Sequence, residues 1–112
     1  MKNKIILRKI IDYCDKVKIL IERFGASYEN FVSDFGYQMA CGMCIIQIGE
    51  LTTRLTEDFK NQNSEIEWTK IKGLRNIYAH DYESVNLKMI WEILTEDIPK
   101  LKEDLQKIYG RG

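Results

Sequence analysis

Residues 35–51 read FGYQMACGMCIIQIGEL, a stretch that is apolar almost throughout. In and just beyond this stretch, apolar side chains recur at the three- and four-residue spacing of an α-helix. They are Phe35, Met39, Met43, Ile46, Leu51, Leu55 and Phe59, with Cys44 and Ile48 beside them. We therefore expect a well-buried helix that runs to about residue 60, with Asp34 as its N-terminal cap.

The segments before this helix also have helical spacing. Residues 3–24 place apolar side chains at positions 6, 10, 13, 14, 17, 20, 21 and 24. This spacing predicts an amphipathic helix, and Gly25 is suited to end it. Ser27 then offers an N-terminal cap for a short helix over residues 27–34.

The segments after residue 60 complete the bundle. Residues 60–65 (KNQNSE) form a polar connection, and Ser64 and Glu67 have the S-x-x-E spacing of a capping box. The helix that follows would end near Ala79 or His80, because Asp81, Ser84 and Asn86 favour turns and caps. Its inward residues would be Trp68, Ile71, Leu74 and Ile77 or Tyr78.

A last amphipathic segment covers residues 85–109, and Pro99 should kink or divide it because proline lacks a backbone N–H. The chain has no alternating strand pattern and no internal repeat. We predict an all-α fold, an antiparallel bundle of four to five helices.

Length and composition set limits on the kind of protein. At 112 residues, 45% hydrophobic and 30% charged, the chain is expected to form one folded domain over residues 1–112. Lys plus Arg and Asp plus Glu are equal at 17 each, so a contact with nucleic acid would need a local cluster of charge. No leader pattern or membrane-length apolar run occurs, which predicts a cytoplasmic protein.

Cys41 and Cys44 form a CGMC element that could suggest a metal or redox site. A zinc site normally needs four ligands, and this chain has one further cysteine and a single histidine far away in sequence. Residues three apart share a helix face, so the pair is better interpreted as core packing. We expect no metal site.

Residues 74–83, LRNIYAHDYE, contain the only histidine of the chain. Arg75, His80 and Tyr82 lie close together there. On an unbroken helix, residues five apart point about 140° away from each other. Arg75 and His80 can therefore share a site only if the helix ends near Ala79 and the turn-prone DYES sequence lets the chain turn back.

An arginine and a histidine together suit RNA cleavage without a metal ion. The guanidinium can bind phosphate oxygens through paired donors, and the imidazole can transfer a proton near neutral pH. Attack of an RNA 2′-hydroxyl on the neighbouring phosphate works better with two proton-transfer groups, whereas each chain has one histidine. The chemistry therefore favours a two-fold homodimer in which two copies of the stretch face each other.

A purely structural interpretation fits the same residues. His80 could act as a charged cap at a helix C-terminus, where it complements the helix dipole. Arg75 could form an ion pair with Asp81 or Glu50, and Tyr82 could be a half-buried aromatic residue.

Residues 75–82, RNIYAHDY, match the R-x4-H-x-Y motif and resemble the HepT-like toxins of the HEPN superfamily. Three flanking segments are similar to the same family: IIQIGEL at 45–51, EWTKIKGLRN at 67–76 and IWEILTEDIPKLKEDL at 90–105. The likeness covers nearly the whole chain.

The resemblance implies a HEPN-like helical bundle that acts as a metal-independent endoribonuclease without a cofactor. Arg75 and His80 would be the catalytic residues of a cleft between two protomers, and Asn76 would orient the phosphate or the arginine. Proteins of this family usually pair with a minimal nucleotidyltransferase antitoxin that adenylylates the motif tyrosine, here Tyr82. The added AMP would prevent RNA from binding in the cleft, because it brings negative charge and fills space there.

Two positions depart from the family pattern, and one further residue is a candidate. Asp81 stands where a small residue is frequent; it could raise the proton affinity of His80 or cap the next helix. Glu67 stands where proline is frequent. Glu50 could hold Arg75 or face solvent. An alternative function is a non-catalytic HEPN module that binds a nucleotidyltransferase as a scaffold, although intact Arg75 and His80 favour the enzyme.

Overall fold

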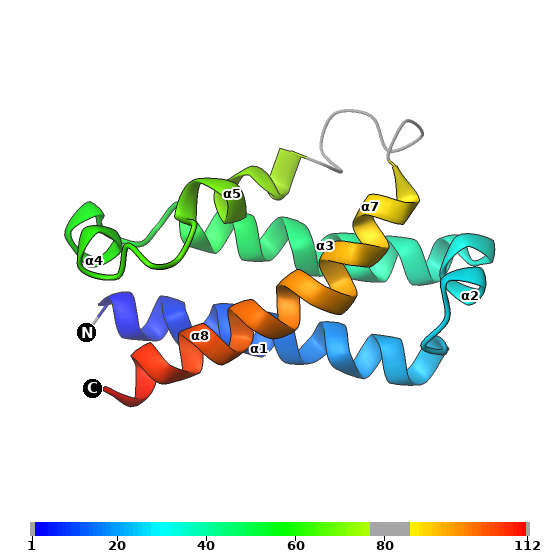
Figure 1. Ribbon diagram of the computed structural model, residues 1–112, viewed down its shortest axis with the longest axis horizontal. Coiled ribbons are helices and arrows are strands. Elements are labelled where there is room, and N and C mark those ends of the chain that lie inside the picture. Colours follow the sequence, from blue (N-terminus) through cyan, green and yellow to red (C-terminus); the bar gives the residue numbers. More distant parts are fainter. Residues whose placement is uncertain (1, 77–85, 112) are drawn as a thin grey trace.

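The computed structural model describes residues 2–76 and 86–111, and Figure 1 shows the order of their helices. The two long helices of the first half are α1 (Lys2–Phe24) and α3 (Phe35–Thr52), joined through the short α2 (Tyr28–Ser33). Two further short helices follow, α4 (Glu57–Gln62) and α5 (Trp68–Gly73). The last rod consists of α7 (Leu87–Glu92), a π-helical turn η2 (Ile93–Asp97) and α8 (Ile98–Gly110).

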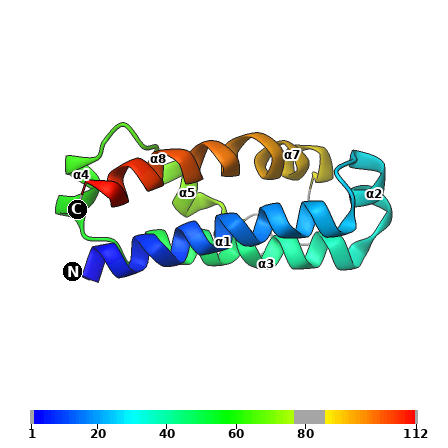
Figure 2. The same ribbon diagram turned by 90° about the horizontal axis from the view of Figure 1, so that it is seen from below.

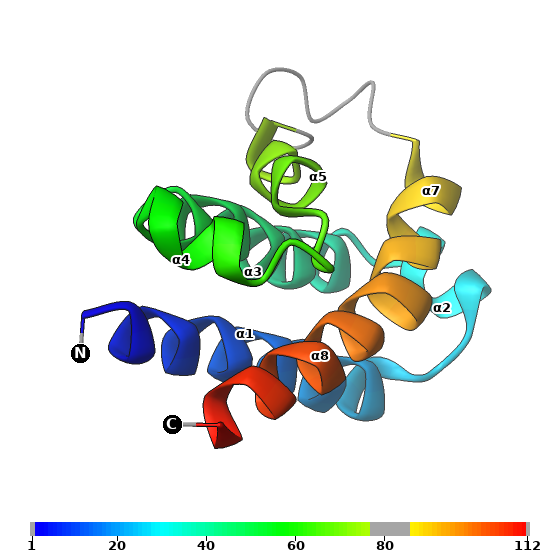
Figure 3. The ribbon, with the colours of Figure 1, turned by 60° about the vertical axis from the view of Figure 1, so that its left-hand side comes forward.

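These helices form the predicted all-α bundle. α1 packs antiparallel against α3 and also contacts α8, while α5 packs on another side of α3 (Figure 3). The rod of α7, η2 and α8 lies across the layer of α1 and α3 (Figure 2). α2 and α4 close opposite ends of the bundle (Figure 1). No helix in the described part of the chain is long and apolar enough to cross a membrane.

The core runs the length of the bundle and takes side chains from each long helix. Ile10 of α1, Ile45 and Ile48 of α3, Ile90 of α7 and Leu105 of α8 have no exposed surface. Burial of a side chain of this size contributes about 1.5–3 kcal/mol to folding. Hydrophobic packing between α1, α3 and α8 is therefore the main source of stability.

Three predicted helix boundaries are confirmed. Gly25 has a φ of +108°, a conformation that glycine adopts readily, and it ends α1. The Ser27 hydroxyl accepts a hydrogen bond from the backbone N–H of Asn30 at 3.1 Å. The Asp34 carboxylate accepts from the backbone N–H groups of Gly36 at 2.9 Å and Tyr37 at 3.2 Å. These side chains satisfy donors that the helix itself leaves free.

The prediction of one helix from residue 35 to about residue 60 is wrong. α3 ends at Thr52, and α4 begins separately at Glu57. The Thr56 side chain caps α4 by accepting from the N–H of Phe59, and the Asn3 side chain accepts a hydrogen bond from the N–H of Thr56 at 3.0 Å. A contact with the first turn of α1 therefore holds the break, and local spacing cannot reveal such a contact.

The predicted burial along α3 is only partly confirmed. Cys41, Cys44 and Ile48 are buried as expected, whereas Phe35, Met39 and Met43 are 73%, 58% and 56% exposed. The buried cysteines, together with Cys14 of α1, are free thiols in the core. Burial raises the pKa of the Cys14 and Cys41 thiols to about 12, so they remain protonated at neutral pH.

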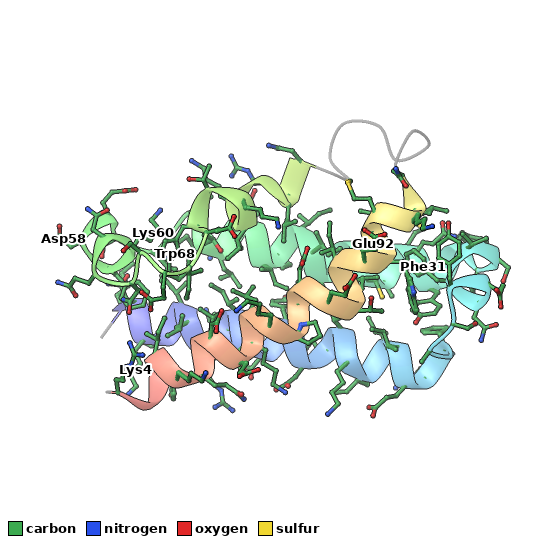
Figure 4. All side chains as sticks on the ribbon, in the orientation of Figure 1. Lys4, Phe31, Asp58, Lys60, Trp68 and Glu92 are labelled. Carbon is green, nitrogen blue, oxygen red and sulfur yellow. The ribbon has the colours of Figure 1, made fainter. Side chains whose placement is uncertain are left out.

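The prediction of a capping box formed by Ser64 and Glu67 is wrong. α5 begins at Trp68, so Glu67 takes the N-cap position, and its side chain makes no capping hydrogen bond. α4 also extends to Gln62, which shortens the polar connection. The indole N–H of Trp68 donates to the backbone carbonyls of Lys60 at 3.2 Å and Asn63 at 3.0 Å. Trp68 thus joins the start of α5 to the end of α4, where Figure 4 shows it close to Lys60.

The predicted division of the last segment at Pro99 is confirmed. Pro99 lies in the first turn of α8 and cannot donate a hydrogen bond to the preceding turn. The backbone takes up this defect as the π-helical turn η2, which lies directly before α8. The last helical rod is therefore continuous but divided, and it bends across α1.

We expect Trp68→Phe to lower the free energy of unfolding by about 0.5–1.5 kcal/mol, because the carbonyls of Lys60 and Asn63 lose the indole donor and keep only their backbone donors. Trp91→Phe is the matched control, since Trp91 contacts Phe31 through its ring at 5.4 Å and a phenyl ring retains an aromatic contact. Urea denaturation followed by circular dichroism measures both. Equal losses in the two variants would contradict the role of the indole N–H.

Candidate functional site

Arg75 lies just beyond α5, and its side chain reaches α3. After a turn at Leu74, the backbone at Arg75 and Asn76 is helical again. The guanidinium Nη1 donates to the Glu50 carboxylate Oε1 at 3.2 Å. Of the alternatives left open for Glu50, the structure shows the contact with Arg75.

The ion pair is partly open to solvent, since the side chains of Arg75 and Glu50 are 34% and 43% exposed. An ion pair with this much solvent contact contributes at most about 1 kcal/mol to stability. It does, however, restrict where the guanidinium can point. A guanidinium has five N–H donors, and in residues 2–76 and 86–111 Glu50 is its only side-chain partner. The remaining donors can bind an anion.

Gly49 sets the distance between α3 and the site. A Cβ atom added at Gly49 would lie 2.8 Å from the backbone nitrogen of Arg75 and 2.9 Å from its Cβ. Only glycine lets the two backbones approach this closely. We did not identify Gly49 from the sequence, although a glycine inside an apolar helix often indicates close packing.

The other predicted site residues divide into two groups. Asn76 is exposed and follows Arg75 directly, so its side chain is free to reach a ligand beside the guanidinium. His80, Asp81 and Tyr82 lie outside the described residues. The same holds for the expected helix end near Ala79.

Positive charge gathers near Arg75 despite the equal totals of acidic and basic residues. Lys70 and Lys72 lie in the last turn of α5, and both are exposed. Neither forms an ion pair with another described residue. Lys72, three residues before Arg75, can help to attract a phosphate, whereas Lys70 lines a hollow with Glu92 and Asp97.

The sequence matches a protein family over most of its length. The description of that family is "Ribonuclease HepT-like", and the match covers residues 10–108. The chain belongs to the HepT-like ribonuclease family. The all-α bundle described above is consistent with the HEPN-like fold of this family.

Curated relatives support the same assignment. A protein of Caldanaerobacter subterraneus subsp. tengcongensis, which bears the provisional name of an RNase, is 34% identical over 91% of this chain and 89% of its own. A protein of Thermococcus cleftensis named as a probable ribonuclease HepT is 33% identical, over 80% of this chain and 83% of its own. No solved structure gives a significant match.

We expect Gly49→Ala to destabilise the protein by about 1–3 kcal/mol, because the new methyl group must push the Arg75 backbone away from α3. Gly73→Ala is the matched control: it lies in α5, and an added Cβ would meet no atom within 4 Å. That change should instead stabilise the helix by up to about 1 kcal/mol. Thermal unfolding of both variants tests the prediction, and a Gly49→Ala variant as stable as the parent would contradict it.

Proposed function

We propose that this HepT-like protein is an endoribonuclease that cleaves RNA without a metal ion. The observation that carries the proposal is the partly exposed guanidinium of Arg75. Glu50 holds it at the surface, Lys72 lies three residues before it in the chain, and its position in the family motif is directly before the segment that contains His80. A fixed cation of this kind suits a phosphodiester substrate.

Each residue has a distinct role in the proposed reaction. Arg75 binds the non-bridging oxygens of the scissile phosphate and stabilises the charge that develops on them. His80 accepts the proton of the 2′-hydroxyl as its oxygen bonds to phosphorus, and the bond from phosphorus to the 5′-oxygen breaks. A second proton donor protonates the leaving 5′-oxygen, and the products carry a 2′,3′-cyclic phosphate and a 5′-hydroxyl. Asn76 and Glu50 position the phosphate and Arg75.

The second proton donor comes from another copy of the chain in this proposal. The sequence contains one histidine, and Arg75 is already committed to phosphate binding. A two-fold homodimer brings two such segments to one cleft. The site of each protomer is incomplete without its partner.

We expect purified protein to cleave cellular RNA in excess EDTA, and Arg75→Ala and His80→Ala to lower the rate by at least about 100-fold each. Gel electrophoresis of labelled RNA measures the rate, and end-group analysis detects the cyclic phosphate. Arg23→Ala is the control, because Arg23 is an exposed arginine in the last turn of α1 with no role in the site. It should cleave at the parental rate.

Intact RNA in the presence of unmodified, folded protein would contradict the nuclease proposal. A non-catalytic partner of a nucleotidyltransferase would then be the better description. Cleavage that stops in EDTA and returns with added Mg²⁺ would contradict the metal-independent step.

We further propose that the protein is the toxin of a cytoplasmic toxin–antitoxin module, neutralised by a minimal nucleotidyltransferase. The Tyr82 phenol oxygen attacks the α-phosphate of ATP, pyrophosphate leaves, and the phenolic proton passes to a base of the transferase. The tyrosine then carries AMP seven residues from Arg75. The phosphate of this AMP can bind the Arg75 guanidinium in place of an RNA phosphate.

We expect co-expression with the partner transferase to increase the mass of the protein by whole AMP units and to abolish its RNA cleavage. Intact-protein mass spectrometry and the cleavage assay measure the two effects. Tyr82→Phe is the control, because it lacks the acceptor oxygen and should remain unmodified and active. An adenylylated protein that still cleaves RNA at the original rate would contradict this mode of neutralisation.

A further inference from the structure

A groove between α1 and α3 gathers positive charge from both sides. Lys9 and Lys16 of α1 line it together with Arg54, which lies two residues beyond the end of α3, and all three are exposed. The groove has a volume of about 330 Å³. Figure 2 shows the two helices side by side. We call this feature the α1–α3 groove.

Acidic neighbours do not balance the positive charge of the groove. The carboxylate that lines it, Asp12, accepts from the Nε of Arg8 at 3.3 Å, so that pair is neutral. Lys9, Lys16 and Arg54 form no ion pair with any other residue of the described part of the chain. The whole chain has no net charge, so these three cations are a local excess that attracts an anion.

The hollow on the other side of α1 lacks this excess. Lys18 and Lys102 line it between α1 and α8, but so do Glu22 and Glu103. Lys102 is also paired with Asp15. Opposite charges therefore cancel in that hollow. The excess belongs to the α1–α3 groove and is not a general property of α1, which borders both.

One cation of the groove is already held in place. The Nζ of Lys16 lies 4.4 Å from the centroid of the Tyr13 ring, which also lines the groove. This cation–π contact keeps the ammonium beside the groove, so less side-chain freedom is lost when a ligand binds. Gln47 of α3 lines the groove as well, and its amide can donate a hydrogen bond.

We propose that the α1–α3 groove binds the sugar–phosphate backbone of single-stranded RNA, next to the phosphate that Arg75 holds. The inference rests on the proposed function in one respect, namely that the substrate is an RNA bound at Arg75. It adds a second area of contact with that RNA and the residues that form it.

The position of the groove favours the RNA substrate as its ligand. At about 100° per residue, Gly49 lies about 100° to one side of Glu50 on α3, and Gln47 lies about 60° to the other. Arg75 packs against Gly49 and binds Glu50 at 3.2 Å, so the site and the groove flank Glu50 at one level of α3. Arg54 follows Glu50 by about one helical turn. A strand that leaves Arg75 therefore reaches the groove across a carboxylate whose charge Arg75 balances.

The spacing of the cations favours a chain of phosphates over a single anion. Lys9 and Lys16 lie seven residues apart, which is about 10.5 Å along α1. One phosphate cannot contact both ammonium groups, whereas successive phosphates of a strand can. The axes of packed helices lie about 8–10 Å apart, a width that suits one strand. An acidic peptide could offer charges at a similar spacing, but only the RNA substrate also has a phosphate at Arg75.

Contacts with the RNA backbone position the strand and do not read its bases. The groove should therefore strengthen the binding of RNA irrespective of its sequence. Cations that neutralise phosphates also release bound counterions, so this part of the affinity falls as the salt concentration rises.

The first test is the affinity for a fluorescent single-stranded RNA of about 12 nucleotides, measured by anisotropy at several salt concentrations. His80→Ala is the background, so that the RNA stays intact. The groove variant combines Lys9→Gln, Lys16→Gln and Arg54→Gln. It should raise the dissociation constant at least about 10-fold at low salt. It should also reduce the slope of log affinity against log salt by about 2, since each phosphate contact contributes about 0.7.

The matched control combines Lys18→Gln, Arg23→Gln and Lys100→Gln in the same background. These residues are exposed and lie outside the groove, and their loss changes the net charge by the same amount. The control variant should bind the RNA within about threefold of the parent and keep its salt dependence.

The second test compares RNAs of different length in the same assay. The parent should bind a strand of about 12 nucleotides at least about 10-fold more tightly than one of about 4, because only the longer strand reaches from Arg75 through the groove. The groove variant should lose most of this gain. A parent without the gain would contradict the proposal.

Single substitutions separate the role of charge from that of folding. Arg54→Gln alone should reduce the salt slope by about 0.7, whereas Arg54→Lys keeps the charge and should retain the parental slope. Circular dichroism should show the parental helix content in both, because the Arg54 side chain is exposed and makes no ion pair with another described residue.

A groove variant that binds RNA with the parental affinity and salt dependence would overturn the proposal. An equal loss in the control variant would also overturn it, because only the total charge would then matter. RNA cleavage by the protein in either case would leave the nuclease standing. A parent that binds RNA through the groove, with His80 intact, but leaves that RNA uncut would refute the nuclease and keep the groove.

Discussion

α3 is apolar on nearly all sides, and a helix of that kind must be covered by neighbours around its whole circumference. α1 covers one side with the core residues of the bundle, and α5 covers another at Gly49. The remaining face holds Phe35, Met39 and Met43, which the described part of the chain leaves exposed. The packing of the bundle and the position of the site therefore both depend on this one helix.

The position of Arg75 depends on backbone packing more than on its ion pair. The contact with Glu50 is partly exposed, and such contacts contribute little to stability. The close approach at Gly49 is a steric constraint on the chain itself, with a hypothetical Cβ only 2.8 Å from the Arg75 nitrogen. Packing thus fixes the backbone, and Glu50 only directs the guanidinium. Among the described residues, most donors of Arg75 have no side-chain partner.

Local sequence patterns predicted those boundaries that depend on local chemistry. Gly25, Ser27 and Asp34 act on backbone groups within a few residues of themselves, and all three were recognised. The break after Thr52 depends on Asn3, which is 53 residues from Thr56. The start of α5 depends on Trp68 bonding to the end of α4. The spacing of apolar residues gives no information on contacts between distant segments. The helix that begins at Phe35 was therefore predicted too long, and the capping box was misassigned.

The candidate site shows the same division. The motif residues Arg75, Asn76, His80 and Tyr82 lie within eight residues of sequence, so the family resemblance identified them without any knowledge of the fold. The sequence also offered Glu50 as a partner for Arg75, but Asp81 fitted equally well. Only the packing of α5 on α3 placed Arg75 beside Glu50.

By itself the sequence determined the fold class, the family and the residues of the motif, because helical spacing and a short motif are local properties. The tertiary structure decided which apolar face of α3 remains uncovered and why residue 49 is glycine. Both depend on which helices become neighbours. An apolar residue has the same local pattern in a core and in an exposed interface, and only the arrangement of the other helices distinguishes the two.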